Sequence, residues 1–179
     1  MEVRSARTWA VFCMGVWLTG TVFTAVVATQ NFYTIDRLLD VQPNPAFRAA
    51  VEKFGRDSMR EVLRYLSSEL NRLYFQYWNL AQLGVGILAL WLVVKVPDAS
   101  RAKWTIVAML ATVLFMTVLI TPAILSVGRA IDFVPRDPPL PQFRTFGLLH
   151  AAYTVLDGVL LILGILVTTW LQKTKGLVS

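Results

Sequence analysis

Long apolar runs alternate with short charged segments along this chain of 179 residues. Four of the runs each have about the 20 residues that a helix needs to cross a hydrocarbon core of roughly 30 Å. They cover about residues 8–29, 73–96, 104–125 and 146–171, and each is bounded by charge, proline or both. The pattern predicts an all-α polytopic membrane protein, with four transmembrane helices in an antiparallel bundle that forms a single domain over residues 1–179.

The only long polar segment, about residues 45–71, has the periodicity of an amphipathic helix. Asn44 suits the helix cap and Pro45 the first helical position. We expect a helical arm between the first two spans that lies on the membrane surface or packs over the bundle, and that can run directly into the second span. Its apolar residues, at spacings of three and four with one imperfect step, are Phe47, Val51, Phe54, Met59, Val62, Leu63 and Leu66.

Prolines interrupt the chain at two places. Pro122 removes a backbone donor near the end of the third run, which predicts a kink or an end of the helix there. Residues 133–142 are predicted to form a stiff, extended connector, because each proline ring restricts its own φ and the conformation of the residue before it. The prolines of this connector are Pro135, Pro138, Pro139 and Pro141.

The first apolar run exceeds the 7 to 15 residues of a signal-peptide core, so we interpret it as a signal anchor. Lysine and arginine are dense in the short flanks on the side of both chain ends, which predicts that both termini are cytoplasmic. The seven basic residues counted on that side are Arg4, Arg7, Lys95, Arg101, Lys103, Lys173 and Lys175.

Composition agrees with a membrane location, since 56% of the residues are hydrophobic and only 16% are charged. The formal net charge of +6 comes from basic residues that flank apolar runs, so it indicates membrane edges and we exclude nucleic acid as a partner. Cys13 is the single cysteine, so no intramolecular disulfide can form. Its neighbour Met14 points to a different helix face, so no metal site is predicted.

Asp157 lies about twelve residues into the fourth run, where an ionised carboxylate is costly, so it must face the bundle interior. Tyr153 or Thr154, and then His150, share its helix face. This polar stripe is consistent with a proton or cation relay or a ligand site. The alternative is a buried hydrogen bond between helices that serves packing alone.

The second span offers partners for this carboxylate. Asn79 and Gln82 recur on one face with Gly86, so an amide can donate to Asp157 while the glycine allows close approach. These amides can equally serve packing alone. A stripe of small residues on the first span also predicts close helix packing; it consists of Gly20, Thr24 and Ala28.

His150 is the only histidine, and three roles compete for it. It can be a hydrogen-bonded packing residue, a pH-sensitive group, or an axial ligand to haem or a chlorophyll-type pigment. A haem held within one chain needs a second ligand, for which Met109, Met116 or a partner subunit are the candidates. No cofactor is predicted, and the haem or pigment remains an alternative.

Several short motifs resemble a four-helix membrane family of unknown function that is typified by transmembrane protein 205. They are Gly15, Trp17 and Gly20 in the first span, Phe75, Gln76 and Tyr77 at the entry to the second, and an F-R pair opening the fourth, followed by His150 and a polar residue seven positions later. The resemblance implies a helical bundle with no settled activity. The family pattern has asparagine where this chain has Asp157, so proton chemistry is not carried over.

No nucleophile with a base, phosphate-binding loop or metal-ligand spacing is present in the sequence, so we do not expect an enzyme. The first hypothesis is a structural or accessory subunit that packs against other membrane proteins or against copies of itself. The second is a small cation or solute transporter or channel that uses Asp157 with Asn79 and Gln82. The third is binding of haem or pigment through His150.

Overall fold

The computed structural model describes residues 2–42, 44–135 and 137–173, which form helices and connectors with no strand among them. Lys175 lies outside the described residues. The all-helical fold class is therefore confirmed. The elements are α1 (Val3–Val41), α2 (Pro45–Phe54), α3 (Arg56–Val93), α4 (Ser100–Phe115), the π-helical η1 (Met116–Ile120), α5 (Thr121–Ala130) and α6 (Pro141–Lys173).

Three helical stretches are long and apolar enough to cross a membrane. They are α1, the continuous stretch from α4 through α5, and α6. In the most apolar 18 residues of each, only 22 to 28% are buried inside the protein. Most of their apolar side chains therefore face outward, as expected for helices surrounded by lipid. The predicted second span, within α3, is not among the three, because Gln76, Asn79 and Gln82 lower its hydropathy.

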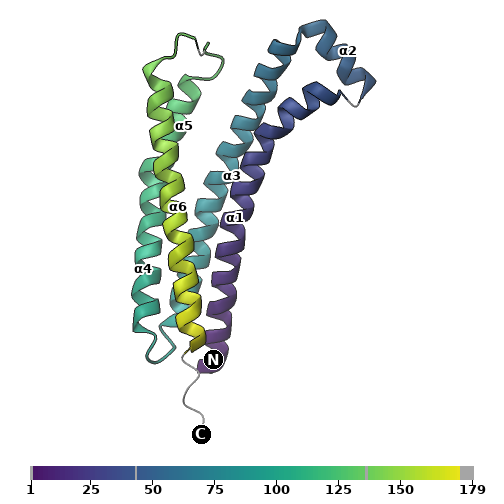
Figure 1. The fold of residues 1–179 in the computed structure, drawn as a ribbon. Helices are drawn as coiled ribbons and strands as arrows, with labels where there is room; N and C mark the ends of the chain where they lie inside the picture. Colours follow the sequence, from purple (N-terminus) through teal and green to yellow (C-terminus); the bar gives the residue numbers. More distant parts are fainter. Residues whose placement is uncertain (1, 43, 136, 174–179) are drawn as a thin grey trace.

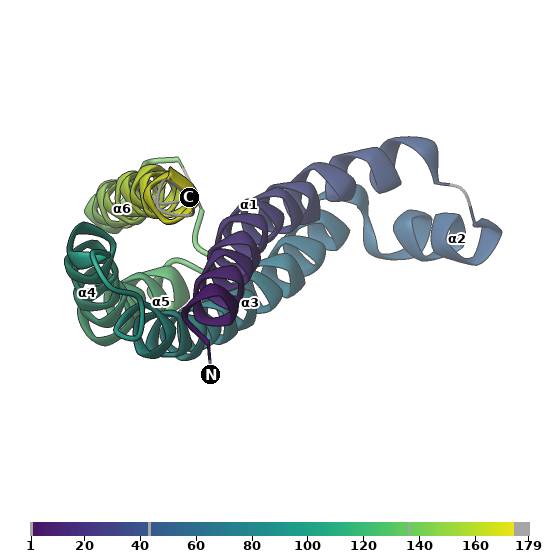
Figure 2. The same cartoon turned by 90° about the horizontal axis from the view of Figure 1, so that it is seen from below.

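The helices surround one apolar core, with α1 and α3 side by side and α4, α5 and α6 completing the bundle (Figures 1 and 2). The first residues of α1, the last of α6 and the turn between α3 and α4 share one end of the bundle (Figure 1). The largest fully buried apolar side chains of this core are Trp17, Met14, Ile106, Met109, Met116 and Leu160.

Beyond the bundle core, α1 and α3 continue as a helical hairpin that diverges sideways from α5 and α6, and α2 lies at its tip (Figures 1 and 2). We call this extension, residues 31–71, the hairpin arm. The arm has its own small core, in which Ile35 and Leu39 of α1 pack with Val51 of α2. The first helix is therefore much longer than the predicted span over residues 8–29. Its last turns belong to the arm, where Ile35 and Leu39 are buried in the small core.

The predicted amphipathic helix over residues 45–71 is broken at Gly55, whose φ of +84° is unfavourable for other residues. This break explains the imperfect step in the apolar periodicity. The expected start is confirmed, because the Asn44 side chain accepts hydrogen bonds from the backbone nitrogens of Ala46 and Phe47, at 2.8 and 3.2 Å. The helix also continues past residue 71 as expected, since α3 runs without a break from Arg56 to Val93. The alternative of packing over the bundle is wrong, because α2 lies at the far tip of the arm (Figure 1).

Pro122 does not end the third helix, which continues to Ala130. The irregularity predicted there takes the form of the π-helical turn η1, just before the proline. At its end the Thr121 backbone nitrogen donates to the Met116 carbonyl, five residues earlier. A π turn shifts the register of the backbone bonds, and this accommodates the donor that proline lacks. The last helix begins at Pro141, five residues before the predicted residue 146, so it takes in the last two residues of the predicted connector.

Candidate functional site

Asn79 forms the centre of a buried hydrogen-bond network that joins three helices. Its side-chain oxygen accepts a 2.7 Å bond from the hydroxyl of Tyr153 on α6, and its amide nitrogen donates a 2.9 Å bond to Thr121 on α5. All three side chains are at most 5% exposed. Because both ends of the amide are satisfied, Asn79 is not available to Asp157.

Gln82 belongs to a second cluster, on the side of α3 that faces α1. In the amide orientation that satisfies its neighbours, its oxygen accepts from the indole nitrogens of Trp17 and Trp78, each at 3.2 Å. Thr21 lies within the same cluster, at 3.2 Å from the Gln82 amide. The two amides share a helix face in the sequence, but their partners differ. Asn79 bonds to α5 and α6, whereas Gln82 bonds to α1.

Asp157 is half-buried on α6, and its Oδ1 atom is buried. No hydrogen-bond donor among the described residues reaches that oxygen. The expectation that Asn79 or Gln82 donates to Asp157 is therefore wrong, because each amide is committed to nearer partners. Tyr153, one helical turn away, directs its hydroxyl to Asn79 instead.

The predicted polar stripe of α6 does not form one site. Tyr153 is buried against α3, whereas His150 and Thr154 are exposed. The Thr154 hydroxyl donates to the backbone oxygen of His150, which satisfies it within its own helix. The imidazole of His150 stacks on the ring of Phe146, with centroids 6.0 Å apart. The cavities that His150 lines include neither Met109 nor Met116, which are fully buried in the core.

The small residues lie at close helix contacts. Gly20 lies against the ring of Trp78, and Gly86 lies against Trp17 and Leu110. Ala28 is buried, and its carbonyl accepts a 2.9 Å bond from the side chain of Asn71 on α3. Thr24 is half-buried on the same helix.

An ion-pair cluster links α3 to the chain after α5, and sequence reasoning missed it. Arg72 donates two bonds, of 2.9 and 3.0 Å, to the two carboxylate oxygens of Asp132. It also pairs with Glu69, which in turn pairs with Arg129 at 3.4 Å. Hydrogen bonds from Arg129 and from Arg72 hold the pKa of the Glu69 carboxyl below its usual value. The only signal in the sequence was a basic residue next to a predicted span, which does not name its partner.

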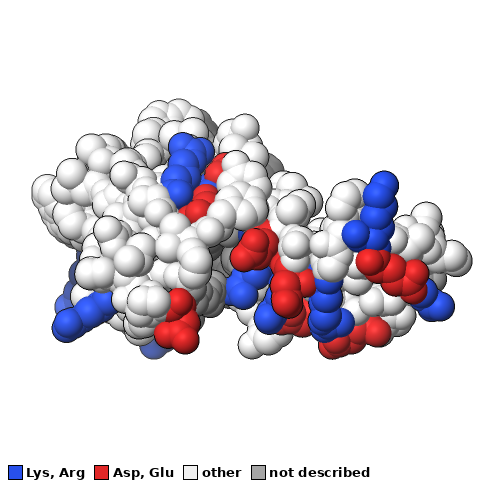
Figure 3. Space-filling view, turned by 90° about the horizontal axis from the view of Figure 1, so that it is seen from above, with Lys and Arg blue, Asp and Glu red and all other residues white. Residues whose placement is uncertain are grey.

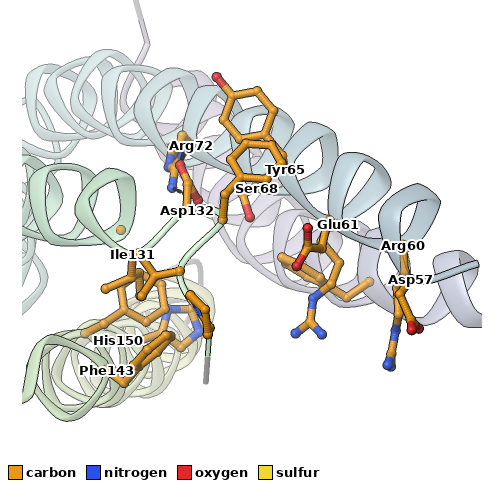
Figure 4. Close-up of a pocket in the computed structure, with 17 residues that line it drawn as sticks. Asp57, Arg60, Glu61, Tyr65, Ser68, Arg72, Ile131, Asp132, Phe143 and His150 are labelled. Carbon is orange, nitrogen blue, oxygen red and sulfur yellow. Dashed lines mark hydrogen bonds and ion pairs between the residues drawn. The ribbon is translucent and has the colours of Figure 1, made fainter. Parts of the chain in front are cut away.

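A groove of about 610 Å³ lies between the hairpin arm and the end of the bundle formed by α5 and α6. In Figure 4, Tyr65 and Arg72 line it from α3, Asp132 from the chain after α5, and His150 and Phe143 from α6. A smaller cavity of about 90 Å³ continues toward the core. It is lined mainly by apolar groups that include Phe75, Ile124, Leu125 and Phe146.

No protein-family model, no curated protein and no solved structure matches this chain. The resemblance to the transmembrane protein 205 family therefore stays a prediction.

Proposed function

We propose that this chain is a non-enzymatic membrane protein that crosses the bilayer with four helices and acts as an accessory subunit, holding another membrane protein through its hairpin arm. The observation that carries the proposal is the construction of the arm. It extends away from the bundle, yet it has a separate core and ion pairs that link its two helices. Such a structure suits a docking element.

The fourth crossing, through α3, is supported by the way its polar groups are arranged. The amides of Asn79 and Gln82 are fully buried and hydrogen-bonded inside the bundle. The outer face of the same segment is apolar, and its large exposed side chains are Leu73, Tyr74, Tyr77, Leu80, Ile87, Leu88, Trp91 and Val94. Lipid would meet only this apolar face, so the mean hydropathy of α3 understates its compatibility with a membrane.

The surface of the arm combines charges of both signs with exposed apolar groups (Figure 3). Arg56 pairs with Asp40 and Arg60 pairs with Asp36 across the hairpin, so these exposed charges link α3 to α1. The large apolar side chains exposed on the arm are Phe32, Tyr33, Val41, Phe54, Val62, Tyr65 and Leu66. Apolar groups set among charges are typical of protein interfaces, in which a dry centre has a polar rim.

The two amides support the accessory role more than the transport hypothesis. A transport path needs polar groups that a solute can reach, but Asn79 and Gln82 are fully buried and satisfied by separate partners. The one observation that favours transport is the buried Oδ1 atom of Asp157, which no described donor reaches.

Photo-cross-linking in native membranes tests the docking role. A photoreactive residue at the exposed Leu66 is expected to join one defined membrane protein, whereas the same residue at the buried Val51 is not. Leu66→Glu should abolish that adduct, and Ser58→Glu, at an exposed polar position of the same helix, should not. A monodisperse single chain in every mild detergent, with no adduct at Leu66, would count against the proposal.

The orientation is proposed as well, with both termini cytoplasmic and the arm on the opposite side. The bundle end that carries the first residues of α1 and the last of α6 also holds the α3–α4 turn and its basic residues. In a Cys13→Ala background, a cysteine at Ser58 should react with an impermeant maleimide added outside intact cells. A cysteine at Ser100 should react only after permeabilisation, and the reverse pattern would invert the topology.

A further inference from the structure

The groove between the hairpin arm and α5–α6 has two regions of different chemistry. Its mouth, the larger part of about 610 Å³, holds every charged residue of the lining. Its floor, the continuation of about 90 Å³, is mainly apolar. Arg72 lines both regions and stands directly before the predicted span over residues 73–96. The proposed fourth crossing through α3, on which this inference rests, puts the mouth at the membrane surface and the floor one to two helical turns inside the hydrocarbon.

The described residues that line the mouth carry equal numbers of positive and negative charges. Three arginines and three carboxylates line it: Arg60, Arg64, Arg72, Asp57, Glu61 and Asp132. Several are already paired with each other or with neighbours, such as Arg72 with Asp132 and Arg60 with Asp36. Because the described lining residues carry equal numbers of both charges, they suit a group that bears an ammonium and a phosphate better than a group of one charge alone.

Aromatic rings surround these charges. The rings of Tyr65 and Phe133 lie 5.1 Å apart, and Phe143 and Phe146 line the facing side of the mouth. The faces of such rings attract ammonium groups, and quaternary ammonium most specifically. The combination of aromatic faces, carboxylates and arginines matches a headgroup that carries both an ammonium and a phosphate.

The floor suits an acyl chain because three of the polar side chains that line it are already hydrogen-bonded to other residues. Tyr153 and Thr121 are bonded to Asn79, and Asn71 bonds to Asn31 and to the Ala28 carbonyl. A chain that enters therefore displaces no hydrogen bond of theirs and meets the apolar surfaces of Phe75 and Leu125.

We propose that this groove binds a zwitterionic phospholipid, with its headgroup in the mouth between α3 and α6 and the first part of one acyl chain on the floor beside Phe75. The volume of the mouth falls within the roughly 300–1,000 Å³ that is usual for small-ligand sites. The ligand comes from the bilayer that surrounds the spans, and the site does not depend on any protein partner.

The test uses the full chain, purified in mild detergent and titrated with phosphatidylcholine, phosphatidylethanolamine or phosphatidylglycerol while bound lipid is counted by native mass spectrometry. Retention of the two zwitterionic lipids is expected to exceed that of phosphatidylglycerol by about tenfold. Free phosphocholine and inorganic phosphate should bind at least about tenfold more weakly than the lipids, because they lack the chain that the floor accepts.

Two pairs of variants locate the site. Glu61→Lys adds positive charge to the mouth, so the lipid preference should shift toward phosphatidylglycerol. Glu52→Lys makes the same charge change on α2, outside the groove lining, and should leave the lipid preference unchanged. His150→Trp fills the junction of mouth and floor and should abolish retention, while Leu148→Trp on the exposed face of α6 should retain lipid.

Four outcomes would overturn the proposal. They are equal retention of zwitterionic and anionic lipids by the unmodified chain, equal binding of free phosphate, an unchanged preference in Glu61→Lys, and undiminished retention in a folded His150→Trp chain.

Discussion

The hydroxyl of Tyr153 on α6 donates a 2.7 Å hydrogen bond to the side-chain oxygen of Asn79 on α3, in the buried interior of the bundle. This bond joins residues 74 positions apart, and the same amide also reaches Thr121 on α5. These hydrogen bonds fix the three helices relative to one another. The stability of variants that lack them therefore tests how the bundle is held together.

Removing this bond should weaken the bundle by a modest amount. Tyr153→Phe is expected to cost about 0.6 kcal/mol, the average for hydrogen bonds between membrane helices, and at most about 1.7 kcal/mol. Asn79→Ala should cost more, because it also releases Thr121. Unfolding of the two single variants and the double variant in detergent gives the coupling free energy. Additive effects of the two substitutions would show that the bond contributes nothing.

The ion pair of Arg72 with Asp132 should contribute more, because the two side chains are only 9 and 16% exposed. Arg72→Met leaves Asp132 without its cation and Glu69 with Arg129 alone, and it is expected to cost about 3 kcal/mol, the lower end of the range for broken buried pairs. Adding Asp132→Leu should recover part of that loss. A double variant that is less stable than Arg72→Met would show that the pair is not the cause.

Glu69 should make stability depend on pH in the acidic range. Its folded pKa is lowered by Arg129 and by Arg72, so its contribution is complete above the unfolded value of about 4.3. The contribution is lost as the pH falls through the folded pKa, where the carboxyl becomes neutral. The difference in unfolding free energy between the wild type and Glu69→Gln should therefore be largest near neutral pH and shrink below pH of about 4. A difference that is constant with pH would contradict this assignment.

Two glycines of α3 provide a matched test of close packing. A Cβ atom at Gly86 would come within 2.7 Å of the fully buried ring of Trp17, whereas a Cβ atom at Gly84 would meet nothing within 4 Å. Gly84→Ala should raise stability by up to about 1 kcal/mol through helix propensity. Gly86→Ala should be about 1 to 3 kcal/mol less stable than Gly84→Ala, because the core is overpacked. Equal melting temperatures would mean that the helices separate freely at this point.

Asp157 separates the accessory role from the transport hypothesis. Since no described donor reaches its buried Oδ1 atom, Asp157→Leu is expected to leave the fold intact and to stabilise it by about 1 to 3 kcal/mol. Asp157→Asn should leave cation flux into proteoliposomes unchanged. Flux that is present in the wild type and lost in a folded Asp157→Asn chain would favour transport instead. Visible absorption of the purified protein that His150→Ala removes would favour the cofactor hypothesis.

Local sequence patterns identified most of the helices of this protein. Hydropathy placed residues 104–125 and 146–171 within helices, and Asn44 and Pro45 marked the start of α2, because these signals depend only on neighbouring residues. The break at Gly55 was visible only as an irregular step in the apolar pattern. Hydropathy counts amides as polar wherever they point, so it could not decide whether α3 suits a membrane.

The tertiary structure decided which polar groups meet. Asn79 and Gln82 share a helix face in the sequence, yet they bond to different helices, and Asp157 bonds to neither. Arg72 and Asp132 are 60 residues apart, and the groove beside them exists only because the hairpin arm diverges from α5 and α6. Such pairings depend on the rotation and tilt of every helix at once, and these are set by packing across the whole bundle rather than by any local stretch of residues.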